Sequence, residues 1–198
     1  TGKDLADLIQ AGGPVMYPLF ALGGLGLLLA LLRTFALLAE RRSLKRLGRE
    51  LPALLDRKDR DGALRLCRSR GGAVSAALAS CLEAAGQPRA QAERLLDQAL
   101  LQGEIALERF LGTLAVLGTL APFLGLLGTV TGMISTFNAL TATGGRDSSV
   151  LAGGIAEALI TTQAGLVMAI PLVLLHSLLA SRAERAGADL EEIGRAHV

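Results

Sequence analysis

The stretch "GGIAEALITTQAGLVMAIPLVLL", residues 153–175, carries one charged side chain, Glu157, in a run that is otherwise apolar and rich in small residues. A helix of this length can cross a hydrocarbon core of about 30 Å, because each residue adds about 1.5 Å. A charge at the centre of a span costs roughly 2.5–3.5 kcal/mol. The stretch therefore predicts a membrane span in which Glu157 has a function. The structural alternatives are an ion pair with a partner helix and a protonated carboxyl group that is merely packed.

The chain contains two further runs of the same kind. Leu8–Leu32 holds 25 residues without a formal charge, Phe110–Gly145 holds 36, and Ser148–Ser181 has Glu157 as its only charged residue. The second run would be about 54 Å long as a helix, so part of it should project beyond the lipid. The first run lacks a basic leader and a clear cleavage pattern, so we expect a span rather than a signal peptide. The sequence predicts an all-α membrane protein with three transmembrane helices.

Lysine and arginine predict the orientation. The segment 40–70 holds eleven basic and five acidic residues, whereas "TATGGRDSSV" at 141–150 holds one of each sign. Basic loops stay in the cytoplasm. We therefore expect a periplasmic N-terminus and a cytoplasmic C-terminus, with long cytoplasmic helical extensions. The predicted segments are a periplasmic segment 1–13, span one 14–39, a cytoplasmic helical region 40–108, span two 109–140, a periplasmic loop 141–150, span three 151–180 and a cytoplasmic C-terminal helix 181–198.

The region 40–108 does not have the composition of an ordinary compact domain. It is expected to form helices broken at "DRDG" (59–62) and "AAGQP" (84–88). Pro88 suits the first turn of a helix, and no stop signal follows it, which predicts one continuous rod into the second span. The charged side chains of this region are interpreted as the solvent-exposed face of its helices. The alternative is contact with anionic lipid by the basic residues Arg41, Arg42, Lys45 and Arg46.

Composition argues against several classes of function. The net charge of +2 gives no reason to expect nucleic acid. Cys67 and Cys81 lack metal-like companions and are interpreted as ordinary helix residues in a reducing compartment. His176 and His197 are isolated. No nucleophile–base pair or metal-ligand spacing is present, so we expect no metal, no cofactor and no enzyme activity.

Small residues recur at spacings of three and four in the second and third spans, which places them on one face of each helix. Helices in lipid associate through such faces, so close packing is the simplest interpretation. Pro122 and Pro171 lie inside these spans and are expected to favour kinks. The second-span face contains Gly125, Gly128, Thr129, Gly132 and Thr136, and the third-span face contains Ala158, Thr162, Gly165 and Ala169.

Glu157, Thr161 and Ala164 share a different stripe of the third span. At about 100° per residue, Thr162 lies about 140° around the helix from Glu157. A polar lumen therefore requires several copies of the chain or the entry of another chain.

The segments "LAPFLGLLGTVTGM" (120–133) and "GGIAEALITTQAGLVMAIPLVLLHSLLASR" (153–182) resemble the ExbB/TolQ/MotA proton-channel family, and the resemblance is best to ExbB. It implies a homo-pentamer in the bacterial inner membrane around a dimer of an ExbD/TolR-type single-span protein that carries an essential Asp. It also implies conversion of proton motive force into mechanical work on a TonB-type protein for outer-membrane transport. MotA-type stators have four spans, which argues against a flagellar role.

Carried over by motif, Thr129 and Thr162 are the pore-lining hydroxyls and Glu157 is the acidic pore residue, either as a proton carrier or as a group that sets the field at the outer mouth. Thr131 stands where ExbB-like members often carry an aromatic residue. Its additional hydroxyl leaves sodium as an alternative to the proton, because sodium-using relatives tend to have extra hydroxyls near the pore. The alternative functions are a TolQ-like envelope-maintenance motor subunit and a non-conducting membrane scaffold. Secondary pore-facing or packing residues are Gly125, Gly128, Gly132, Thr136, Thr161 and Gly165.

Overall fold

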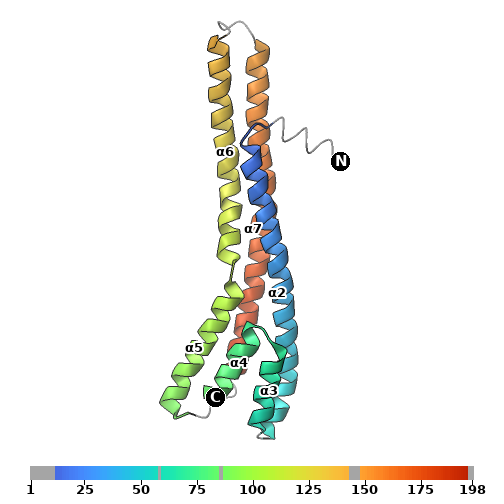
Figure 1. Ribbon diagram of the computed structural model, residues 1–198, viewed down its shortest axis with the longest axis vertical. Helices are drawn as coiled ribbons and strands as arrows, with labels where there is room; N and C mark the ends of the chain where they lie inside the picture. The colour runs from blue at the N-terminus through green and yellow to red at the C-terminus, as the bar shows by residue number, and fades with distance from the viewer. Residues whose placement is uncertain (1–11, 58, 85–86, 143–147, 196–198) are drawn as a thin grey trace. The chain divides into compact units, whose positions relative to one another are not determined.

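The computed structural model describes residues 12–57, 59–84, 87–142 and 148–195, and every regular element in these ranges is an α-helix (Figure 1). The helices are α2 (Met16–Asp56), α3 (Arg60–Arg70), α4 (Ala73–Ala84), α5 (Arg89–Glu108), α6 (Leu111–Ala142) and α7 (Ser148–Arg195).

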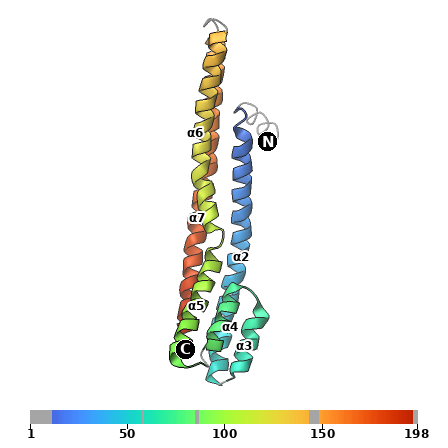
Figure 2. The same ribbon diagram turned by 60° about the vertical axis from the view of Figure 1, so that its left-hand side comes forward.

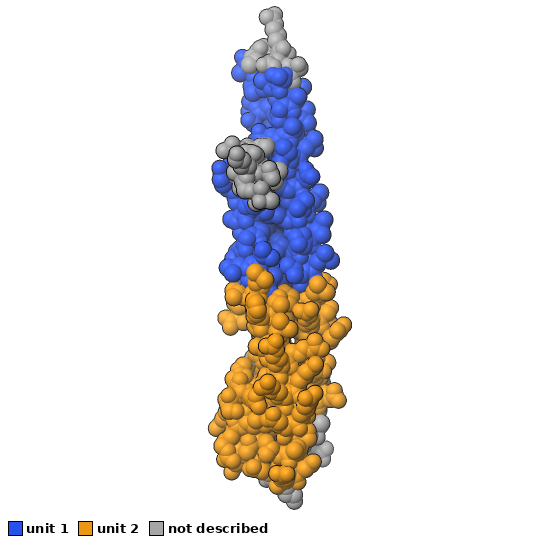
Figure 3. Space-filling model, turned by 90° about the vertical axis from the view of Figure 1, so that its right-hand side faces the viewer, with its two compact units in different colours: residues 1–30, 113–176 blue, residues 31–112, 177–198 orange. Residues whose placement is uncertain are grey.

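The chain divides into two compact units, coloured separately in Figure 3. Unit 1 comprises Thr1–Ala30 and Thr113–His176, and unit 2 comprises Leu31–Gly112 and Ser177–Val198. Because α2 and α7 each contribute one part to unit 1 and another part to unit 2, both units contain segments that are distant in the sequence.

Unit 1 is built from the first part of α2, most of α6 and the first part of α7, and α6 and α7 lie side by side in it (Figures 1 and 2). Both helices continue through the internal Pro122 and Pro171. The surface of the unit is apolar, with Phe123 65% and Val167 62% exposed. The prediction of three spans is confirmed, since three segments are long and apolar enough to cross a membrane: Met16–Asp56, Gln91–Ala142 and Ser149–Ile193.

The expected continuous rod into the second span is wrong at Arg109 and Phe110. Helix α5 ends at Glu108 and α6 begins at Leu111, with Phe110 at a φ of 65°. The break is stabilised from α2: the Arg33 guanidinium donates hydrogen bonds to Ala106 O at 2.8 Å and to Leu107 O. A cation at a helix C-terminus satisfies carbonyls that lack a helical partner and opposes the helix dipole.

Unit 2 has a core of its own, to which residues 40–108 contribute most of the buried side chains. The end of α7 adds to the apolar side chains that residues 40–108 bury themselves. The fully buried leucines Leu47 and Leu51 come from α2, and Leu190 comes from α7, where it contacts Gly103 of α5. Cys67 of α3 and Cys81 of α4 are buried in the same unit.

Charged side chains from α2 and α3 cap both ends of α4. At its N-terminus, Val74 N donates to Glu40 Oε2 at 3.4 Å. At its C-terminus, the Arg60 guanidinium donates to Leu82 O at 2.6 Å and to Glu83 O at 3.1 Å. A further break precedes α4 at Gly71 and Gly72, which both have positive φ. Glycine tolerates this conformation, and we did not predict this break from the sequence.

We predict that Arg33→Met loosens the last turn of α5. The substitution keeps an apolar stem but leaves the carbonyls of Ala106 and Leu107 without their charged donor, and hydrogen bonds to charged groups contribute about 1.5–3 kcal/mol. Hydrogen–deuterium exchange of residues 104–112 should be faster than in the wild type. Arg42→Met, which removes an exposed arginine from the same helix, is the control. Equal exchange in the wild type and Arg33→Met would contradict this account of the break.

We also predict that the two cysteines react slowly in the folded protein. Burial raises the pKa of the Cys67 thiol, and it raises the pKa of Cys81 from 9.0 to about 11. The thiolate is the reactive form, so at pH 8 the reactive fraction of Cys81 is about a hundredfold lower than that of an ordinary thiol. Labelling with a maleimide should be slow at pH 8 and fast in denaturant. Rapid labelling of the folded protein would show that α3 and α4 do not enclose these thiols.

Candidate functional site

Helices α6 and α7 approach until their backbones touch, and two glycines make this possible. A methyl group placed on Gly165 would lie 2.8 Å from Ala121 O and 3.0 Å from the Gly125 Cα. A methyl group on Gly125 would lie 3.2 Å from both Thr161 O and the Thr162 Cα. Both added methyl groups would meet backbone atoms, which cannot rotate away as a side chain can. The absence of two side chains therefore sets the separation of the helices.

The close approach brings together the two hydroxyls that the family motif singles out. Thr129 Oγ1 on α6 and Thr162 Oγ1 on α7 are hydrogen-bonded to each other, and either oxygen can be the donor. Both hydroxyls also lie within hydrogen-bond distance of Gly125 O, at 3.2 Å from Thr129 and 3.1 Å from Thr162. Both threonines are half-buried, so part of each residue remains exposed at the surface of the chain.

The other small residues of the second span also face α7. A side chain on Gly128 would overlap the Thr161 methyl group, and one on Gly132 would meet the Ala158 Cβ at 3.2 Å. Thr136 is 5% exposed, and its hydroxyl donates to Gly132 O at 2.8 Å. The structure thus places Gly125, Gly128, Gly132, Thr136 and Gly165 in the helix–helix contact.

Glu157 lies on another face of α7, against the chain that leads into α2. A side chain on Gly13, which has a φ of 70°, would overlap Glu157 Oε1. Gly13 O accepts a hydrogen bond from Met16 N at 3.1 Å, in the turn that starts α2. The carboxylate is therefore next to a helix N-terminus, where free N–H groups and the helix dipole favour a negative charge.

Thr161 links this turn to α7. Its side chain is 1% exposed, and its hydroxyl lies 2.7 Å from Gly12 O and 3.0 Å from Glu157 O, donating to one or both. The contact joins residues far apart in the sequence and holds the Gly12–Gly13 turn beside Glu157. Within one chain, the Thr161 hydroxyl thus joins this turn to the part of α7 that carries Glu157.

The predicted residues therefore form two clusters rather than one. Thr129 and Thr162 meet at the α6–α7 contact, whereas Glu157 and Thr161 meet the start of α2, in agreement with the 140° separation expected on α7. Gly12 and Gly13 were not predicted as site residues. The triplet "GGP" at 12–14, directly before an apolar helical run, is a helix-start signal that could have identified them.

The additional hydroxyl of Thr131 does not join either cluster. Thr131 is exposed, and its hydroxyl donates to carbonyls of its own helix, Leu127 O at 2.9 Å and Gly128 O at 3.1 Å. This is the usual behaviour of a threonine inside a span.

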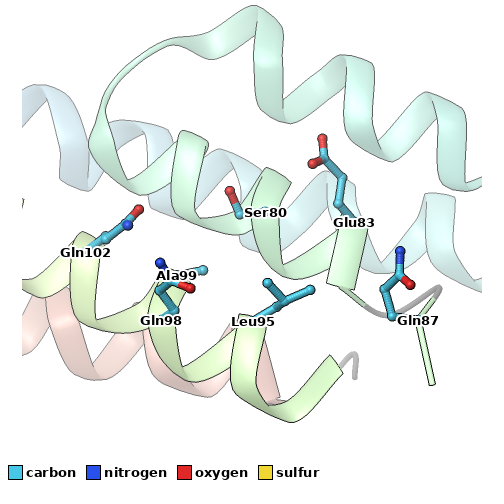
Figure 4. Close-up of a pocket in the computed structure, with 7 residues that line it drawn as sticks. All are labelled: Ser80, Glu83, Gln87, Leu95, Gln98, Ala99 and Gln102. Atoms are coloured by element: carbon cyan, nitrogen blue, oxygen red, sulfur yellow. The ribbon is translucent and has the colours of Figure 1, made fainter. Parts of the chain in front are cut away.

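Unit 2 contains a polar cavity of about 330 Å³ between α4 and α5 (Figure 4). Its polar lining includes Ser80, Gln98 and Gln102. Its one carboxylate, Glu83, forms an exposed ion pair with Arg68 at 2.7 Å. The cavity offers neutral hydrogen-bonding groups rather than an acid–base pair. Across the described parts of the chain, no three His, Cys, Asp or Glu side chains are grouped closely enough to hold a metal ion.

We predict that Gly165→Ala separates α6 from α7. The added methyl group meets backbone atoms, and overpacking of this kind costs about 1–3 kcal/mol. The thermal unfolding temperature in detergent should fall. Gly153→Ala on the same helix is a matched control, because a methyl group there has no atom within 4 Å. It should leave the unfolding temperature unchanged or raise it, since alanine favours helix. A similar result for both variants would contradict the backbone contact.

The sequence matches a protein-family model and several known proteins. Residues 70–192 match the model of the MotA/TolQ/ExbB proton channel family. A putative biopolymer transport protein ExbB homolog from Methanothermobacter thermautotrophicus is 32% identical over 181 residues, which cover 89% of this chain and 63% of the relative. The chain thus spans less than two thirds of that relative.

Two bacterial relatives match shorter segments. The biopolymer transport protein ExbB of Salmonella typhimurium is 40% identical over 82 residues, which cover 41% of this chain and 34% of the relative. The Tol-Pal system protein TolQ of Pseudomonas aeruginosa is 38% identical over 91 residues, which cover 46% of this chain and 39% of the relative. Since the family model matches more than half of the sequence, the chain belongs to the MotA/TolQ/ExbB proton channel family.

Proposed function

We propose that this protein is the channel and stator subunit of an inner-membrane motor. In this proposal a homo-pentamer surrounds a dimer of an ExbD/TolR-type single-span protein with an intramembrane Asp. The N-terminus is periplasmic, and residues 40–108 and 181–198 are cytoplasmic. The observation that carries the proposal is the hydrogen-bonded pair of Thr129 and Thr162 at a glycine-lined helix contact in a member of a proton channel family.

The threonine pair has the chemistry that proton transfer requires. A hydroxyl both donates and accepts hydrogen bonds, so two adjoining hydroxyls can pass a proton or order a chain of water. Both threonines are half-buried, which leaves room for a further group on their open side. In the assembled protein that group is the partner's Asp, and the wet lumen is completed by neighbouring subunits.

Glu157 is assigned to the outer mouth of this path. It lies beside Gly13 at the start of α2, about 7.5 Å along α7 from the level of Thr162. At this position the carboxylate attracts cations toward the channel. We therefore favour a role in setting the electric field at the mouth over a role as a proton carrier that passes protons to the threonine pair. Each proton that crosses 100 mV releases about 2.3 kcal/mol, so a few protons suffice to move a rigid helix pair.

The client favoured is a TonB-type protein that drives outer-membrane transport, because the motifs are most similar to ExbB. A TolQ-like role in envelope maintenance is the second candidate, since a TolQ protein matches 46% of the chain. The channel is expected to conduct protons. In both cases the ion flow is converted into work on a component of the cell envelope.

Proton flux into liposomes that contain the protein and its single-span partner tests this function. Thr162→Val keeps the shape of the side chain but removes the relay hydroxyl, so flux should fall to background. Glu157→Gln removes the attracting charge and should reduce flux without abolishing it. Thr119→Val is the control, because that exposed hydroxyl bonds only to its own helix in the part of the chain described, at Ala115 O and Val116 O.

The same measurement separates the alternatives. Wild-type flux in Thr162→Val would contradict the assignment of the threonine pair. Absence of flux from the wild-type complex in both proton and sodium gradients would support a non-conducting scaffold. Flux driven by a sodium gradient rather than a proton gradient would show that the conducted ion is sodium. The proposed path past the threonine pair would still stand.

A further inference from the structure

A cavity of about 200 Å³ lies in unit 2 between α2 and α7 and is lined mainly by arginines. Arg41 projects into it from α2, and Arg182 and Arg185 from α7. Asp189 is the one acidic residue in the lining, which is completed by Ala186. Two helices that are distant in the sequence thus direct three cations to one small space.

In the parts of the chain that the structure describes, none of these three guanidinium groups belongs to an ion pair. The ion pairs found there are Arg68 with Glu83 and Arg70 with Glu50, and both lie outside the cavity. The neighbouring Glu40 is engaged by Val74 N. The three cations share the cavity with the single carboxylate of Asp189, so two positive charges remain and the cavity is electrostatically suited to an anion.

The cavity also adjoins apolar surface. Leu38, one turn before Arg41 on α2, is 39% exposed, and Leu178, one turn before Arg182 on α7, is 58% exposed. Residues three or four apart share one face of a helix, so each arginine continues an exposed apolar stripe. Arg182 directly follows Ser181, the end of the third apolar run. A molecule that fits here has an anionic end and an apolar body.

We propose that this cavity binds the phosphate group of an anionic phospholipid, with the acyl chains along Leu38 and Leu178. The planar guanidinium group pairs bidentately with phosphate, and basic pockets between helices on the cytoplasmic side are suited to lipid headgroups. Arg42, Lys45 and Arg46 do not line the cavity and are not part of this site. The site is separate from the ion path and does not depend on the proposed conduction.

Lipid binding to the full-length protein in detergent, measured by native mass spectrometry, tests this site. The probes are phosphatidylglycerol, phosphatidylcholine and inorganic phosphate. Phosphatidylglycerol should bind best, and Arg41→Gln or Arg182→Gln should each weaken its binding about fivefold, the fold-change that corresponds to about 1 kcal/mol per basic residue near a lipid surface. Asp189→Asn removes the repelling carboxylate and should strengthen binding.

Arg42→Gln is the matched control, because it removes the same charge from the next residue of the same helix without altering the cavity lining. Its effect should be much smaller than that of Arg41→Gln. Equal weakening in the two variants would show diffuse attraction to a basic surface and would overturn the proposal. Binding of inorganic phosphate as tight as that of phosphatidylglycerol would also overturn it, since a site for soluble phosphate needs no lipid. Circular dichroism of each variant verifies that the helices remain folded.

Discussion

The backbone contact between α6 and α7 at Gly125 and Gly165 is the constraint on which the proposed site depends. Hydrophobic association provides little force between helices in lipid, so close packing and hydrogen bonds have to hold them together. A methyl group at Gly165 would meet carbonyl and Cα atoms at 2.8–3.0 Å, which leaves no flexible side chain to move aside. The two helices can reach this separation only where both faces lack side chains.

This separation has a chemical consequence. Only at backbone contact can two short side chains, Thr129 and Thr162, hydrogen-bond across the interface and share Gly125 O. The same 3.6-residue geometry turns Glu157 away from that pair and toward the start of α2. The carboxylate lies there beside Gly13, close to a helix N-terminus, where the helix dipole favours a negative charge. The 3.6-residue repeat of α7 thus places Gly165 and Thr162 on the face that packs against α6, and Glu157 on another face.

Much of this arrangement could be predicted from residue spacing alone. The three spans follow from charge-free length, and the two faces of α7 follow from about 100° per residue. The break at Phe110 could not be predicted, because it is stabilised by Arg33, a residue 73 positions away from the first carbonyl that it binds. The contact of Gly13 with Glu157 was missed for the same reason, and so was the packing of Leu190 of α7 against Gly103 of α5. Local patterns reveal a helix face but not the partner that covers it.

In the proposed complex, Thr129 and Thr162 face a water-filled interior. The most direct measurement is the accessibility of a Thr162→Cys variant in membranes with the partner present, after Cys67 and Cys81 have been replaced by alanine. We predict that a small water-soluble thiosulfonate reagent labels the Thr162→Cys variant rapidly. Labelling should be slower where the partner's helix packs closely against this position. Labelling only by a lipid-soluble maleimide would show that the position faces acyl chains, and it would contradict the account.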